Sequence, residues 1–167
     1  MNDITSKPDW HFMQNGPTTL FKSQKLFEDA TEDMRDLGYL ILNIDCETDE
    51  KVLASFVDGL HWQNQFGYRP EELNLDALND AVRGEPFDSC DRAVVAFDHF
   101  QGFWKRDQDT AFAVLDIFAS ASRSYLIFGK RLLSFIKVSD PNIHIDGLGA
   151  TAAIWNDKEW LNKDRGL

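Results

Sequence analysis

Residues 38–46 read GYLILNIDC, and this short run decides the fold class. It begins with a glycine and is then apolar and β-rich over a length typical of a strand. Because polar residues do not alternate with the apolar ones, both faces of the strand should be buried, as they are in parallel sheets. Similar runs follow at 92–100 (RAVVAFDHF) and 132–138 (LLSFIKV). The sequence therefore predicts three buried strands.

Segments with helical spacing separate these strands. Thr48 is a suitable N-cap for a helix in which apolar residues recur until Gly59. Further helices are expected over 24–38 and over 107–128, the second apolar on nearly all sides and well buried. A short edge strand is expected at 18–21. Strands that alternate with helices predict an α/β fold, a small parallel β-sheet with helices packed on it.

The length and composition limit the class of protein. A chain of 167 residues corresponds to about one domain. Its apolar runs are all shorter than the roughly 18 residues of a membrane span, and its first residues have no basic region followed by an apolar stretch. Cys46 and Cys90 have no CxxC partner and are expected to be buried thiols in a reducing compartment. We therefore expect a cytoplasmic protein that does not bind membranes.

The charge of the chain is unevenly distributed. The formal net charge is −11, and the segment 28–98 holds 18 acidic residues against 5 basic ones. A field of this sign repels nucleic acid and attracts basic partners. Direct binding of nucleic acid is therefore not expected. The acids could equally serve solubility alone, and composition does not separate the two explanations.

Residues 71–84, EELNLDALNDAVRG, predict a short helix with one apolar and one polar side. Like charges four residues apart lie side by side on a helix and repel each other. No lysine offsets them in this segment, so the polar side must face water or a basic partner. The apolar side, with Leu75, Leu78 and Val82, is expected in the core. The polar side comprises Glu72, Asp76, Asn79, Asp80 and Arg83.

The segment before this helix, HWQNQFGYRPEE (61–72), is expected to be a long loop rich in aromatic residues. Aromatic side chains beside a charged stripe are typical of the centre of a protein interface. They could instead cap the hydrophobic core. The candidate partner-binding residues from this loop are Trp62, Phe66 and Tyr68.

Phe66-Gly67 followed by NLDALNDAV (74–82) resembles the sequence hallmark of the barstar family, small intracellular inhibitors of secreted ribonucleases. In that family an aromatic-glycine pair precedes Asn, an apolar or aromatic residue, Asp-Ala-Leu, a further residue and Asp. The order of strands and helices is also similar. The resemblance implies a barstar-like domain over 18–140, preceded by an N-terminal segment, 1–17. A C-terminal extension, 141–167, is expected to pack on the domain.

The resemblance implies roles for single residues. Asp76 and Asp80 match the two family aspartates that face the ribonuclease, and Asp80 matches the one that occupies the phosphate-binding site of the enzyme. Asn74 matches an asparagine that caps the helix. The chain also departs from the family pattern, with about six inserted residues (YRPEEL) before Asn74. Asn79 replaces an aromatic contact residue, and Ser120 replaces an acid that contributes to binding.

These observations predict an acidic immunity-type protein that blocks the active site of a basic ribonuclease or ribonuclease toxin. It is expected to be a monomer when free, to need no cofactor or metal, and not to be an enzyme. One alternative is a barstar-like module that binds a different basic protein, such as another toxin or a regulator.

A third interpretation is a metal-dependent hydrolase. Asp98-His99 and His144-x-Asp146 are the groupings of histidine and aspartate that this interpretation would use. Neither has the i, i+4 spacing of a helical zinc pair.

The C-terminal extension contains apolar residues that are expected to pack on a sheet edge or a helix face. They are Ile143, Ile145, Ile154 and Trp155.

Overall fold

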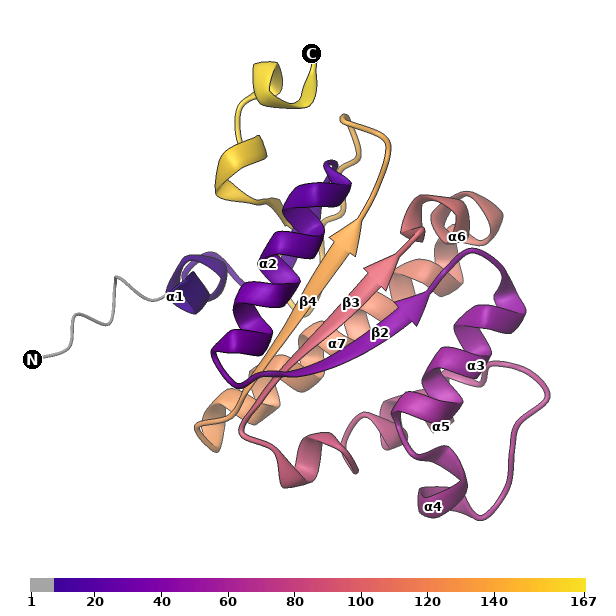
Figure 1. Ribbon diagram of the computed structural model, residues 1–167. Helices are drawn as coiled ribbons and strands as arrows, with labels where there is room; N and C mark the ends of the chain where they lie inside the picture. The colour runs from indigo at the N-terminus through magenta and orange to yellow at the C-terminus, as the bar shows by residue number, and fades with distance from the viewer. Residues whose placement is uncertain (1–7) are drawn as a thin grey trace, which may run out of the picture.

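A computed structural model describes residues 8–167 and shows a single sheet with helices on both faces (Figure 1). The strands are all parallel and lie in the order β2–β3–β4–β1–β5. This confirms the predicted α/β fold with a parallel sheet. The strands are β1 (Thr18–Phe21), β2 (Leu40–Asp45), β3 (Arg92–Asp98), β4 (Arg131–Lys137) and β5 (Ile154–Trp155).

Two hydrophobic cores lie on the two faces of the sheet, because side chains alternate along each strand. In β3, Val94 and Ala96 pack with the helix α2 (Gln24–Asp36), whereas Val95 and Phe97 pack with the other large helices. That second face carries α3 (Asp49–Gly59), α4 (Trp62–Phe66), α5 (Leu75–Ala81), α6 (Phe100–Arg106) and α7 (Gln108–Ile127). Shorter elements are α1 (Pro8–Met13) and the 3₁₀ helices η2 (Phe87–Ser89), η3 (Asp157–Glu159) and η4 (Asn162–Arg165).

Side-chain caps fix where the long helices begin. The Thr48 hydroxyl accepts the backbone N–H of Lys51, and the Asp107 carboxylate accepts that of Thr110. Each cap pairs a donor that has no partner inside the helix. The predicted starts of α3 and α7 are therefore confirmed. In the part of the chain described, no helix is both long and apolar enough to cross a bilayer.

The strand predicted at 92–100 is two residues too long. β3 ends at Asp98, His99 adopts a left-handed backbone with φ of 55°, and Phe100 begins α6. Phe100 is fully buried, so its apolar character continues the pattern of the strand although the chain has already turned. The apolar pattern thus marks burial correctly and misplaces the end of the strand.

Two further expectations are corrected. β1 is not an edge strand, because β5 pairs beyond it through Thr19 with Ile154 and Leu20 with Trp155. The helix α7 is well buried along most of its length, but its C-terminal end is exposed to solvent. Ile127 is 82% exposed and Phe128, the C-cap, is 77% exposed. Periodicity cannot reveal this end, because it extends beyond the sheet that buries the rest.

The C-terminal segment is held against β1 and α2. Ile143 and Ile145 are buried, and the buried carboxylate of Glu159 accepts hydrogen bonds from the backbone N–H groups of Lys22 and Ser23, both at 2.8 Å. The guanidinium of Arg165 donates to backbone oxygens of the same segment and lies 4.6 Å from the centre of the Trp155 ring. These contacts fix the last turns of the chain beside the N-terminus of α2.

Candidate protein-binding site

The helix α5 presents its acidic side to solvent because its other side completes the core. The side chain of Asn74 accepts the backbone N–H of Ala77 at 2.9 Å, so the helix begins at Leu75. Leu78 and Val82 are fully buried, and Leu75 is half-buried. The side chains of Asp76 and Asp80, on the opposite side, are exposed.

Glu72 does not belong to this helix. The predicted stripe of three acids on one helix is therefore wrong, because Asn74 caps the helix two residues after Glu72. Glu72 is exposed in the segment before the cap. The acidic surface of α5 consists of Asp76 and Asp80 alone.

The charges of Asp76 and Asp80 are not compensated within the described residues. Neither carboxylate takes part in a hydrogen bond or an ion pair there. Arg83 lies one turn after Asp80, but its guanidinium is directed to the hydroxyl of Ser124 on α7 at 3.5 Å. Two like charges at i and i+4 therefore stand side by side, at a cost of a few tenths of a kcal/mol. An external cation can approach both of them.

The aromatic residues of the predicted loop divide into one buried and two accessible side chains. Trp62 begins the short helix α4 and is fully buried, so its prediction as a partner-binding residue is wrong. Tyr68 is 48% exposed, and Phe66 is half-buried with its ring centre 5.0 Å from that of Trp62. The large apolar surface of an indole favours the core. The buried ring of Trp62 thus packs against the rings of Phe66 and Tyr68.

Polar contacts that no sequence pattern predicted hold α5 in place. The side-chain nitrogen of Gln65 lies within hydrogen-bond distance of the carbonyl oxygens of Leu60, Ala81 and Glu85. The hydroxyl of Tyr125 on α7 donates to the carbonyl oxygen of Val82 at 2.8 Å. The bonds to Ala81 and Val82 pair carbonyls at the C-terminal end of α5, which have no partner within the helix. The acidic helix is consequently anchored to both α4 and α7.

Of the two positions that depart from the family pattern, Asn79 lies on α5 itself and Ser120 lies on α7, one turn before the Ser124 that Arg83 contacts. Asn79 is half-buried on α5, between the two aspartates in sequence. Ser120 is half-buried on α7, and its carbonyl oxygen accepts the hydroxyl of Ser124. Neither adds an aromatic ring or a negative charge to the surface.

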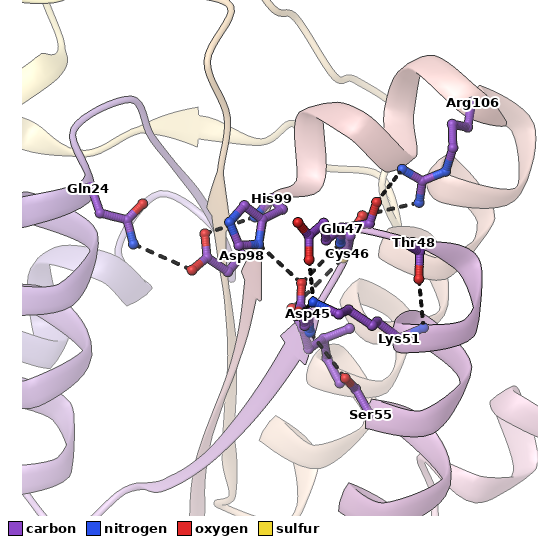
Figure 2. A network of polar contacts seen from close by, with 11 residues as sticks. Gln24, Asp45, Cys46, Glu47, Thr48, Lys51, Ser55, Asp98, His99 and Arg106 are labelled. Carbon is purple, nitrogen blue, oxygen red and sulfur yellow. Dashed lines mark hydrogen bonds and ion pairs between the residues drawn. The ribbon is translucent and has the colours of Figure 1, made fainter.

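A second polar cluster lies at the carboxyl ends of β2 and β3 (Figure 2). The imidazole Nδ1 of His99 is 3.1 Å from Asp45 Oδ1, and the backbone N–H of His99 donates to Asp98 at 2.8 Å. Lys51 on α3 also lies 3.1 Å from the Asp45 carboxylate. Burial favours a higher pKa for Asp45, but hydrogen bonds from the Glu47 backbone, Lys51 and His99 outweigh it and lower the pKa. Asp45 is therefore a stable anion.

The chemistry around this cluster is that of a structural junction. The neighbouring thiol of Cys46 is fully buried, and burial raises the pKa of that thiol, so it is not a thiolate nucleophile. Arg106 on α6 donates to the carbonyl oxygens of Cys46 and Glu47. The cluster thereby ties α6 to the end of β2. Among residues 8–167, no three His, Cys, Asp or Glu side chains are placed to hold a metal ion.

The other pairing of histidine and aspartate is exposed to solvent. His144 Nε2 lies 4.0 Å from Asp146 Oδ2, and both side chains are more than 70% exposed. Neither grouping of the hydrolase interpretation combines a base with a positioned nucleophile.

Comparison with protein families matches residues 39–137 to the model described as barstar, the barnase inhibitor. The chain belongs to the barstar family. The match runs from the residue before β2 to the end of β4 and includes α5 with Asp76 and Asp80. The predicted family resemblance is therefore confirmed. Comparisons with curated proteins and with solved structures return no match for this chain.

Proposed function

We propose that this barstar-family protein binds a basic ribonuclease or ribonuclease toxin through α5 and blocks its active site. The observation that carries the proposal is the pair of exposed, uncompensated carboxylates of Asp76 and Asp80 on an anchored helix. They lie inside the segment that matches a family of ribonuclease inhibitors. In a complex their missing counter-charges are supplied by the partner.

The active site of a ribonuclease is a chemical complement of this helix. Such a site gathers Arg, Lys and His side chains to hold phosphate groups. Carboxylates can imitate phosphates and accept charge-assisted hydrogen bonds from the same donors. Barnase and barstar themselves are the known example of this complementarity, and its magnitude is carried over to this chain from them. We assign Asp80 to the phosphate-binding position and Asp76 to the neighbouring contact.

The surroundings of α5 have supporting roles in this proposal. Phe66 and Tyr68 contribute apolar contacts beside the acidic pair, and Asn79 and Arg83 contribute polar ones. The excess of acids over 28–98 attracts the basic partner from a distance and raises the association rate. The domain at 18–140 carries the binding surface, and the extension at 141–167 stabilises it.

A different basic protein is the alternative partner. It is favoured by Asn79 and Ser120, which remove an aromatic and an acidic contact from the family pattern. The surface that remains suits any cationic site of matching shape. A toxin without ribonuclease activity or a regulator would then occupy α5.

The test begins with capture of the partner. The immobilised full-length chain is incubated with soluble and secreted proteins of the source organism, and the eluate is assayed for cleavage of a fluorogenic RNA. We expect a captured ribonuclease whose activity disappears when the chain is added back in equal amount. Capture should fall when both Asp76 and Asp80 are changed to alanine. A captured protein without ribonuclease activity would replace this proposal by the alternative.

We also propose that the protein has no hydrolase activity of its own. The carboxylates and amides of α5 accept hydrogen bonds but have no base–nucleophile pair beside them. The purified chain and its His99→Ala variant should both leave RNA and phosphoesters intact. Turnover that His99→Ala abolishes would show an enzyme.

A further inference from the structure

A groove of about 500 Å³ lies between α3 and the segment 69–73, which directly precedes Asn74 and the acidic helix α5 in the chain. In Figure 1 this segment is part of the wide loop that leads from α4 past α3 to α5. Phe103 of α6 and Thr110 of α7 also line the groove. Its volume is within the range of sites that bind small ligands or single side chains. The wall on one side consists of residues of the insertion that the family pattern lacks.

The groove combines an apolar floor with an acidic rim. Leu53 and Leu73 are half-buried along the floor. Glu50, Glu71 and Glu72 are exposed on the rim. A long cationic side chain suits such a site, because its methylene groups can lie on the floor while its charged end reaches the carboxylates.

The other charged groups of the groove are already paired. Asp49 accepts the Nε–H of Arg106 at 3.0 Å, and Arg69 lies 3.2 Å from Asp58. The Asp107 carboxylate accepts both the backbone N–H and the hydroxyl of Thr110.

The rim glutamates have no such partners. Within residues 8–167, Glu71 and Glu72 have neither an ion pair nor a side-chain hydrogen bond, and Glu50 has no ion pair. A backbone hydrogen bond and Thr48 lower the pKa of Glu50, so it remains ionised at neutral pH. The groove therefore combines its apolar floor with three rim carboxylates that have no ion-pair partner among the described residues.

We propose that the groove binds a basic segment of the partner protein, with an Arg or Lys side chain on Leu53 and Leu73 and its charge between Glu71 and Glu72. The proposal rests on the proposed function, because it takes the partner to be a basic protein that lies along α5. The segment 71–73 leads directly into Asn74 and α5, so one partner can contact both surfaces. The insertion would then set which basic partner is accepted.

Charge complementarity also decides against other occupants. A second copy of this chain carries a net charge of −11 and is repelled by an acidic rim. Nucleic acid is repelled for the same reason. A cationic segment with an apolar stem gains from both the rim and the floor.

The test uses the full-length chain and a defined probe. The probe is the peptide N-acetyl-Arg-Leu-Arg-amide, and its control is the same peptide with citrulline, which has the shape of arginine without the charge. Binding is followed by amide chemical shifts of the ¹⁵N-labelled protein. We expect saturable shifts for residues of α3 and 69–73 with the arginine peptide and at least about fivefold weaker binding of the citrulline peptide.

Matched variants locate the binding energy. Changing both Glu71 and Glu72 to Gln should weaken binding of the arginine peptide about fivefold, the size expected for two exposed ion pairs. Changing both Asp76 and Asp80 to Asn should leave the binding at the groove unchanged. Shifts confined to α5, equal binding of the two peptides, or no saturable shift would each overturn the proposal.

The two proposals can fail separately. If the groove binds the arginine peptide but the captured partner is not a ribonuclease, the proposed function fails and the groove remains. If the chain inhibits a ribonuclease with the same dissociation constant after both Glu71 and Glu72 are changed to Gln, the groove proposal fails and the function remains.

Discussion

Replacing Glu159 by alanine should strongly destabilise the protein, although this residue lies outside the segment that matches the family. Its side chain is almost fully buried, with 4% exposed. The carboxylate accepts the backbone N–H groups of Lys22 and Ser23 at 2.8 Å and the side-chain amide of Asn156 at 2.7 Å. Alanine leaves all three donors without this acceptor.

The size of the effect follows from these three bonds. A hydrogen bond to a charged group contributes about 1.5–3 kcal/mol, and an abandoned buried donor loses its full desolvation cost. The two backbone donors lie in a half-buried turn and can regain water, so the total is smaller than the sum. We expect Glu159→Ala to lower the free energy of unfolding by about 3–5 kcal/mol. With a urea slope of about 2 kcal/mol per M, the midpoint of unfolding falls by about 1.5–2.5 M.

Equilibrium unfolding in urea at neutral pH, followed by tryptophan fluorescence, measures this change. Asp157→Ala is the matched control, because Asp157 is an exposed acid in the same short helix. It should alter the free energy by no more than about 0.5 kcal/mol. Glu159→Gln keeps an acceptor without the charge and should fall between the two. A Glu159→Ala midpoint equal to that of Asp157→Ala would refute the reasoning that this carboxylate fastens the tail to the domain.

Three further predictions concern stability. Trp62→Phe removes a buried indole N–H that has no partner in the described structure, so it should lower the free energy of unfolding by less than about 1.5 kcal/mol. Trp62→Ala also removes the ring and should lower it by about 3–5 kcal/mol. Equal urea midpoints for the two variants would contradict this. Burial and the Asp9 carboxylate raise the pKa of Tyr39 from 10.0 to about 12, so the folded state holds this proton more tightly. The stability that this proton contributes is complete below pH 10 and is lost as the pH rises towards 12. Urea midpoints should therefore fall less over this range in Tyr39→Phe than in the wild type. An equal fall in both proteins would refute the raised pKa of Tyr39. Phe128→Ser should change the free energy by less than about 0.5 kcal/mol because this side chain is 77% exposed, and a loss above 1 kcal/mol would show a hidden contact.

The parts of the fold that depend on local pattern could be predicted from the sequence. The apolar run of β2 and the cap of α3 at Thr48 both mark their elements correctly, because strand propensity and capping are written in adjacent residues. The expected burial of both faces is wrong for β2, because it is an edge strand of the sheet and its Leu40 and Asn43 side chains are exposed. The helix α4 was missed, since five residues are too few to show helical periodicity. The left-handed turn at His99 was also missed, because an ordinary side chain stands where a glycine would have signalled it.

Contacts between distant parts of the chain could not be predicted. Glu159 accepts from Lys22 across 137 residues, and no spacing rule connects such positions. In the candidate site, too, local spacing predicts some features and tertiary packing decides the others. Asp76 and Asp80 could be assigned to one exposed helix side from their spacing, whereas the burial of Trp62 depends on how α4 packs against the core. Glu72 was misplaced because the cap at Asn74 has priority over the i, i+4 pattern.

The dissociation constant of the complex with the captured ribonuclease, measured for Asp80→Ala, tests the central claim most directly. The control is Asp33→Ala, an exposed aspartate inside α2 on the opposite face of the sheet. Loss of a carboxylate that meets Arg or Lys in a buried interface costs about 2–5 kcal/mol, so Asp80→Ala should weaken the complex by about 30- to 5000-fold.

Asp33→Ala should change only the association rate and its dependence on salt, by a small factor. Melting temperatures of both free variants should stay close to that of the wild type, which separates binding from folding. If Asp80→Ala and Asp33→Ala bind the ribonuclease equally well, α5 is a solvated helix and the inhibitory surface lies elsewhere.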